Sequence, residues 1–300
     1  MAFRLREDES VAKGLSRVVR KELRSAVERL TGDRSDEAIH DARKSIKKVR
    51  AVLQLVGDEL DASAALKDLR RASHLLSPLR DMDAMIETAR SLRSRDDATS
   101  ANQSALGTHL ARQKAALTAD ADRGDILTRA ARMLDRVHRD ARDWRWKRTH
   151  FAGLAKAIKR SHKRARRVMQ TARDHDTPDT FHDWRKRVKT LWYALRLLEG
   201  RAPRLHRPIA DFKRLETWLG DDHNLHVLQK QTRSLKASHA TADGLAHLRT
   251  LMERRQRQLR RKTLALGGRL LAHSPKSFTQ RVRAMWEPKS RAPQRSSAAA

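Results

Sequence analysis

Two segments of the chain carry histidine, arginine and lysine in the same order and at the same spacing. Residues 40–47 and residues 182–189 both read His-Asp-x-Arg-Lys-x-x-Lys. Arginine presents a planar fork of N–H donors to phosphate oxygens, and lysine adds a mobile point charge. A histidine ring supplies a further hydrogen bond to phosphate. The repeated pattern therefore points to binding of a phosphate-bearing anion.

On a helix, the first copy separates into a charged face and an apolar face. With 3.6 residues per turn, alanine, isoleucine, valine and leucine side chains of residues 42–56 share one side. That side is suited to packing inside a bundle, and the neighbouring side is left with cations in a row. The row consists of His40, Arg43, Lys47 and Arg50, with Lys44 close by.

The second copy divides in the same way, and it carries His182, Arg185, Lys186, Lys189 and Arg196 on its basic face. Ordinary solvated charges on amphipathic helices are the plain alternative for both rows. Two observations count against that alternative. Acids at the i+4 positions that would pair with the cations are missing, and one fixed order of residues recurs in two places. We therefore interpret both rows as binding residues.

Other segments add positive charge in similar rows, and three of them are rich in cations. The first lies within 8–31, the second within 150–174 and the third within 248–269. Long rows of cations suit a ligand with regularly spaced negative charge, because displaced counterions then favour binding. From the first two segments we select Arg17, Arg20, Lys21, Lys156, Lys159, Arg160 and Lys163 as further candidates.

The composition agrees with an anionic partner and narrows the class of protein. The chain has 67 Lys and Arg against 36 Asp and Glu, a net charge of +31 that disfavours compactness unless an anion offsets it. There is no cysteine, which excludes disulfides, thiolate metal sites and a cysteine nucleophile. No stretch approaches the about 18 apolar residues of a membrane span, and the first residues form no signal peptide. We expect a cytoplasmic protein that does not contact membranes.

The elements that must position these residues are predicted to be helices throughout. Apolar residues recur with helical rather than alternating periodicity, so the predicted fold class is all-α. Caps are predicted at Ser35, Thr177 and Ser274. The predicted helices are 8–31, 36–57, 62–77, 81–94, 101–121, 126–142, 150–174, 179–199, 205–219, 222–237, 242–271 and 275–286, with loops at 94–100 and 121–125 and a disordered tail at 287–300.

The environment of each motif also repeats, which divides the helical region into two halves. Gly14 and Leu15 precede the first copy as Gly153 and Leu154 precede the second. We expect one domain over 1–286, with related halves at about 5–142 and 148–286. Each half is expected to be a bundle of helices.

At these residues the chain resembles the CHAD family, the conserved-histidine α-helical domain. Its signature is His-x-x-Arg-x-x-x-Lys-x-x-Arg, which the row beginning at His40 matches in full. The second row matches His182, Arg185 and Lys189, but Trp192 replaces the last arginine, and Arg196 lies one turn further on. The segment 80–83 resembles the Arg-Asp-x-Asp stretch that follows in the family.

The resemblance implies a fold and a ligand. The fold would be two antiparallel helical bundles related by a pseudo-twofold, with a basic groove or pore between them. The ligand would be inorganic polyphosphate, bound without catalysis, and some members associate with polyphosphate granules. The resemblance implies no cofactor.

Two other functions remain open from the sequence. A nucleic-acid binder is permitted by the charge, although the chain is only 4% aromatic, which leaves few side chains for base stacking. The second alternative is an enzyme that processes polyphosphate, or an accessory to one. In either copy of the motif the histidine and the adjacent aspartate do not face each other on a helix, so we predict no catalytic residues. The oligomeric state is left open.

Several smaller signals are interpreted as structural. Asp81 and Asp83 are predicted to cap a helix after Pro78 rather than to bind a metal. His223 and His226 lack an identified third ligand, so no metal site is predicted. Five of the tryptophans are assigned to the core or to packing between bundles.

Overall fold

The computed structural model describes residues 3–56, 60–92, 106–116, 122–146, 151–233 and 242–286. Every regular element within these ranges is helical, which confirms the predicted all-α class. None of the described helices is long and apolar enough to cross a membrane. The loop predicted at 94–100 and the tail at 287–300 lie outside the described residues.

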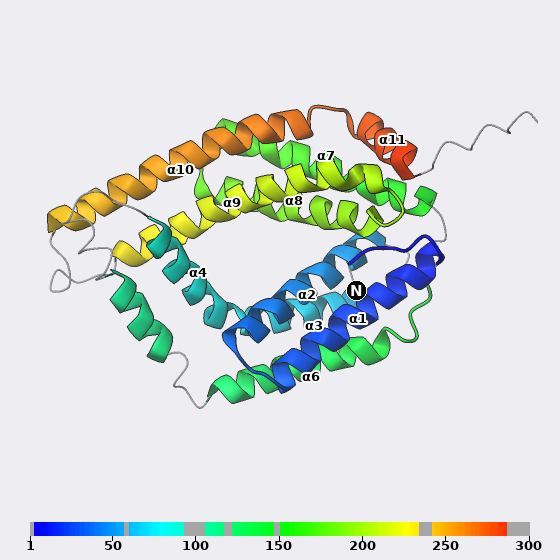
Figure 1. Cartoon of the computed structure of the whole chain (residues 1–300), viewed down its shortest axis with the longest axis horizontal. Coiled ribbons are helices and arrows are strands. Elements are labelled where there is room, and N and C mark those ends of the chain that lie inside the picture. Colours follow the sequence, from blue (N-terminus) through cyan, green and yellow to red (C-terminus); the bar gives the residue numbers. More distant parts are fainter. Residues whose placement is uncertain are drawn as a thin grey trace, which may run out of the picture.

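Four helices of the first half, α1, α2, α3 and α6, pack as one group in Figure 1, whereas α4 and the helix over 106–116 pack against the second half in a separate hydrophobic core. Helix α1 packs against α2 and α6, and α3 packs against α6. Amphipathic sequences build this group, with the apolar face of each helix turned inward. The elements of the first half are α1 (Val11–Thr31), α2 (Asp36–Val56), α3 (Ser63–Leu75), α4 (Ser77–Ser91), an unlabelled helix over 106–116 and α6 (Asp122–Asp140).

The second half forms the other group of helices in Figure 1. Helix α8 packs between α7 and α9, α10 lies against α9, and α11 closes on α7. The elements are α7 (Phe151–His175), α8 (Pro178–Leu198), a 3-10 turn η2 (Pro203–Leu205), α9 (His206–Arg233), α10 (Ala242–Leu270) and α11 (Pro275–Trp286).

The predicted caps are confirmed. Ser35 Oγ accepts a hydrogen bond from the backbone N–H of Ala38 at 3.1 Å, and Ser274 caps α11 in the same way. Thr177 forms a reciprocal capping box with Thr180 at the start of α8. Each cap satisfies N–H groups that the first turn of a helix leaves without a partner.

Two predicted boundaries are wrong. The break predicted between 219 and 222 is absent, because α9 runs through Gly220 without interruption. Glycine does not form a turn there; it lets the Arg185 guanidinium approach closely, since a Cβ atom would lie 3.1 Å from Nη2 of Arg185. The loop predicted at 121–125 is also wrong. Helix α6 begins at Asp122, and Arg123 anchors its start by an ion pair with Asp36 at 3.0 Å.

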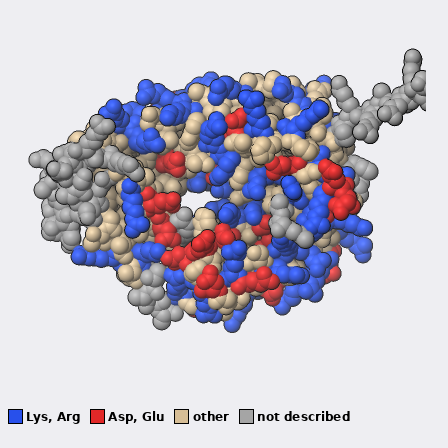
Figure 2. Space-filling view, in the orientation of Figure 1, with Lys and Arg blue, Asp and Glu red and all other residues tan. Residues whose placement is uncertain are grey.

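The two halves share a hydrophobic core and face each other through α2 and α4. Helix α2 contacts α7 and α8, and α4 contacts α9. The N-terminal segment joins the halves as well, because Leu5 N–H donates to the Leu197 carbonyl at 2.8 Å and the Phe3 ring packs edge-on against Tyr193. In Figure 2 an opening between the two groups of helices is visible, with basic and acidic side chains on its rim.

Candidate anion-binding site

Four cations from the two repeated motifs come together where α2 faces α8. We call them the cation cluster: Arg43 and Lys47 on α2, and Arg185 and Lys189 on α8. Their positive charges act on one another, because Lys189, Arg43 and Arg185 all lower the pKa of Lys47. The structure therefore unites the centres of the two rows that the sequence singled out.

Lys47 is the least compensated member of the cluster. It is half-buried, and it forms neither an ion pair nor a hydrogen bond with any described residue. Burial first, and then the charges of Lys189, Arg43 and Arg185, lower the pKa of its ammonium to about 7. Both causes disfavour the charged form. A bound anion would reverse the second cause and restore the charge.

Lys189 differs from Lys47 because a carboxylate lies beside it. Glu216 on α9 accepts hydrogen bonds from Lys189 at 2.8 Å and from Lys213 at 2.9 Å, and Arg185 lies 3.6 Å away. Burial by itself would raise the pKa of Glu216, which is only 3% exposed. The charges and hydrogen bonds of Lys189 and Lys213 outweigh burial and lower this pKa to about 2.

The first half contains no counterpart of Glu216. The buried residues Leu69, Ala72 and Leu76 repeat as Phe212, Leu215 and Leu219. In this alignment Glu216, which follows Leu215, corresponds to Ser73, which follows Ala72. Glu216 therefore forms an ion pair with Lys189, whereas it acts on Lys47 only through its charge, which raises a pKa that burial and the neighbouring cations lower further.

Arg43 is held by the junction of α3 and α4. It donates hydrogen bonds to the carbonyl oxygens of Leu76 and Ser77, at 3.3 and 3.1 Å, and forms an ion pair with Asp81 at 3.2 Å. The capping role predicted for Asp81 is wrong. Helix α4 begins at Ser77, with Pro78 in its first turn, so Asp81 lies inside the helix.

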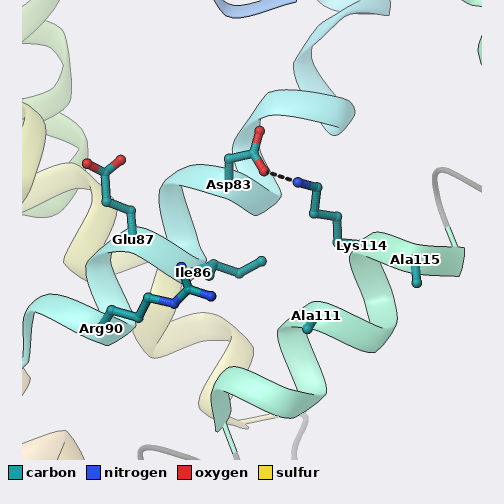
Figure 3. A pocket seen from close by; sticks show the side chains of 7 residues that line it. All are labelled: Asp83, Ile86, Glu87, Arg90, Ala111, Lys114 and Ala115. Carbon is teal, nitrogen blue, oxygen red and sulfur yellow. Dashed lines mark ion pairs between the residues drawn. The ribbon is translucent and has the colours of Figure 1, made fainter. Parts of the chain in front are cut away.

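Asp83 is not a cap either. It binds Lys114 of the 106–116 helix at 2.6 Å, on the rim of a cavity of about 650 Å³ shown in Figure 3. The same view shows Arg90 and Ile86 on the α4 side of this cavity and Ala111 on the other side. Its lining mixes charges of both signs with apolar side chains, and it lies apart from the cation cluster.

Arg185 packs over Gly220 on α9, and Arg43 donates a hydrogen bond to the Ser77 carbonyl at the start of α4. Arg185 and Gly220 thus correspond to Arg43 and Ser77. In both halves a backbone position without a bulky side chain faces the guanidinium group. Arg185 keeps its Nε atom buried and without a hydrogen-bond partner. The paired arrangement of Arg43 and Arg185 supports the predicted relation between the halves.

The motif histidines lie in different surroundings. His182 is half-buried and stacks on His223, with 4.0 Å between ring centroids. Burial first, then Lys186 and Arg185, lower the pKa of His182, so that its neutral form is favoured. His40 is exposed. Asp222, beside His223, is bound by Arg260 at 2.9 Å, and the described residues contain no group of three metal ligands.

Trp192, which departs from the family pattern, forms an aromatic surface beneath two cations. Its ring is 7% exposed and lies 5.1 Å from the Arg196 guanidinium and 4.9 Å from the Lys213 ammonium. Both distances are within the range of cation–π attraction. In the first half, burial and then Arg70 lower the pKa of Arg50, which occupies the corresponding position.

The structure does not bring the candidate row of α1 into contact with the cluster. Arg17 is engaged by Glu9, with Nε to Oε2 at 2.8 Å, and by the Arg4 carbonyl. Burial first, and then the charges of Arg24, Arg142 and Arg20, lower the pKa of His138 on α6, so the charge of Arg20 acts on α6. Arg17 therefore holds the N-terminal segment in the structure described here, and its role in anion binding stays a prediction.

The remaining candidates lie on exposed helix surfaces. Lys44 and Lys186 each form an ion pair with the motif aspartate, Asp41 or Asp183, at 3.2 and 2.9 Å. On α7 only one candidate lines a pocket, which is shared with α2 and α8. The exposed α7 candidates are Lys156, Lys159 and Lys163, and the pocket residue is Arg160.

Sequence reasoning missed Glu216, Lys213 and Gly220. The pattern along each motif helix includes only the acids of that helix, whereas Glu216, which pairs with Lys189, lies on α9. Lys213 and Glu216 are spaced i,i+3, which is a signal of a local ion pair. Nothing in the linear pattern connects that pair to Lys189, which lies more than twenty positions earlier.

These features define a class: an all-helical protein of two related halves with cations gathered between them. A family model of the CHAD domain matches residues 17–233, and the chain belongs to this family. The crystal structure of the CHAD domain from the plant Ricinus communis is similar, with 18% sequence identity and a TM-score of 0.62. The match covers 91% of this chain and 95% of that one and shows the shared fold. No curated protein matches the chain.

Proposed function

We propose that the protein binds inorganic polyphosphate at the cation cluster, without catalysis. The observation that carries the proposal is Lys47, a half-buried ammonium surrounded by Lys189, Arg43 and Arg185 and paired with no described acid. An unpaired buried charge is costly for a folded protein. A polyanion that passes between α2 and α8 would supply the missing negative charge.

The burial of the cation cluster favours a slender anion over a nucleic acid. The cluster is half-buried between two helices, and a phosphate chain without bases or sugars is narrow enough to reach it. Two motif-helix tryptophans, Trp184 and Trp192, are buried and therefore not available for base stacking. Nucleic acid is kept as the secondary alternative because surface cations attract any polyanion.

The lowered pKa of His182, which favours its neutral form, also supports binding rather than acid–base chemistry. Its half-buried ring is stacked on His223, and burial lowers its pKa, so it suits a hydrogen-bonding role toward phosphate. We propose that the cytoplasm is the site of action and that polyphosphate granules are one place where the protein binds.

Binding to polyphosphates of graded length, with DNA and RNA as competitors, tests this function. Each of the two substitutions in the variant Lys47→Gln/Arg185→Gln should weaken the binding of long polyphosphate by up to about tenfold. The matched control Lys276→Gln, which removes an exposed charge on α11, should bind normally. Binding should also weaken steeply with salt, as expected when counterions are released.

Three results would contradict the proposal. The first is equal weakening in the cluster variant and in the control. The second is displacement of polyphosphate by DNA at equal phosphate concentration. The third concerns catalysis: incubation with Mg²⁺ should leave polyphosphate chain length unchanged, and release of phosphate would show an enzyme.

A further inference from the structure

The two halves differ at a second place, between the first helix of each half and the motif helices. Burial along α1 and α7 follows the same pattern, since Leu15, Val18 and Val19 are buried as Leu154, Ala157 and Ile158 are. Extending this alignment by one turn places Glu22 of α1 at the position of Ser161 of α7. An acid in one half therefore corresponds to a small hydroxyl in the other.

In the first half the Glu22 carboxylate neutralises the Lys48 ammonium. The carboxylate is buried, accepts a hydrogen bond from Ser45 Oγ at 2.6 Å and forms an ion pair with Lys48 at 2.8 Å. The Phe3 ring covers this place, 5.6 Å from the Lys48 ammonium and 5.9 Å from the Arg196 guanidinium. The charge is thus satisfied by the chain itself.

In the second half the corresponding place is a cavity of about 280 Å³ between α2, α7 and α8. None of its lining residues is acidic, and three of them are arginines. The polar lining consists of Gln54, Arg160, Ser161, Arg164, Arg187 and Thr190.

Two arginines of this cavity differ from Lys48, which is neutralised by an ion pair with Glu22. Arg164 and Arg187 form no ion pair with a described acid, and Asp183, whose charge Arg187 feels, is already bound to Lys186 at 2.9 Å. The Thr190 hydroxyl lies 3.1 Å from the Lys186 carbonyl oxygen and 3.4 Å from Oε1 of Gln54, so its proton is used within the protein.

We infer that this cavity, the α2–α7–α8 pocket, is a separate binding site for a small phosphate-type anion such as pyrophosphate. The anion takes the place that the Glu22 carboxylate occupies in the first half. Guanidinium forks bind phosphate oxygens in pairs, and the Ser161 hydroxyl supplies a further donor. The volume is near the lower end of the about 300–1,000 Å³ of small-ligand pockets, which suits a ligand of this size.

The test is calorimetric titration with pyrophosphate in the Lys47→Gln/Arg185→Gln background, so that the cation cluster does not contribute. Ser161→Glu supplies the missing carboxylate internally; it should abolish binding and raise the melting temperature. Ser161→Gln matches the added side chain without the charge and should not raise the melting temperature. Arg164→Ala/Arg187→Ala should lower the affinity at least several-fold.

Arg167→Ala removes an exposed arginine from the same helix outside the pocket and serves as the control for non-specific charge. It should bind pyrophosphate as the background does. The inference is overturned if Ser161→Glu, while folded, binds as tightly as the background, or if Arg167→Ala weakens binding as much as the pocket variant. Because the cluster is disabled throughout, these results do not depend on polyphosphate binding at that site.

Discussion

Glu216 of α9 accepts a hydrogen bond from Lys189 at 2.8 Å, whereas Ser73 stands at the position of Glu216 in the half that contains Lys47. The internal repeat thus places two lysines in equivalent positions and compensates only one of them. Lys47 is half-buried among positive charges, and burial together with those charges lowers its pKa to about 7. Within the cation cluster, Lys189 is therefore the lysine that a buried carboxylate holds, and Lys47 is the lysine that we propose binds the anion.

Replacing Lys47 with methionine should stabilise the free protein and weaken its binding of polyphosphate. An apolar side chain of similar length removes an unsatisfied buried charge, which costs about 1–3 kcal/mol when left without a partner. Chemical denaturation at neutral pH and a binding titration measure the two effects. Lys276→Met, on the exposed surface of α11, should change neither. Loss of stability in Lys47→Met would show that this ammonium supports the fold.

Polyphosphate binding should weaken as the pH rises through neutrality. Lys47 has a pKa of about 7 in the free protein, so it loses its proton above that pH, and a bound anion must raise the pKa again. Binding at about pH 8 should therefore take up a proton, which calorimetry in buffers of different ionisation enthalpy detects. Lys47→Arg remains charged and should bind with less dependence on pH. Equal affinity of the natural protein at about pH 6.5 and about pH 8.5 would contradict this role.

Replacing Glu216 with glutamine should have the opposite pair of effects. Loss of one partner of a buried ion pair costs about 3 kcal/mol of unfolding free energy, while the freed Lys189 and Lys213 should strengthen polyphosphate binding. The pKa of Glu216 is lowered to about 2, so its contribution is complete above its ordinary value of 4.5 and is lost as the pH falls toward 2. The variant should accordingly show a flatter loss of stability over that acidic range. A folded variant with weaker binding would argue that Glu216 orients the lysines for the ligand.

Two glycines within helices should respond differently to alanine. At Gly220 the added Cβ lies 3.1 Å from the end of the Arg185 side chain, which can shift. The helix gains about 0.5–1 kcal/mol from alanine, so stability should hold while binding weakens. At Gly267 the Cβ lies 2.4 Å from the buried Trp184 ring, and alanine should destabilise the protein. Thermal melts and binding titrations of both variants distinguish the two, and a Gly220→Ala protein with unchanged binding would remove Arg185 from the contacts.

Local signals predicted the helices and their caps because those signals act over a few residues. Ser35 and Thr177 cap their helices through contacts three positions away, and the burial of Ile46 and Val188 follows from helical periodicity. The same signals failed at Gly220, where the choice of glycine depends on a guanidinium from another helix. The ion pair of Arg17 was not predicted either, since its partner Glu9 lies on the segment before α1.

The sequence by itself determined the all-helical class, the duplication and the identity of the cations in the two motifs, because periodicity and repetition are written along the chain. Only the tertiary structure decided which cations are compensated. Ion pairs form over a few ångströms of space, and the acids Glu216, Asp81 and Glu22 reach Lys189, Arg43 and Lys48 from other helices. The packing of those helices leaves Lys47 without an ion pair to any described acid, and no spacing within α2 predicts this.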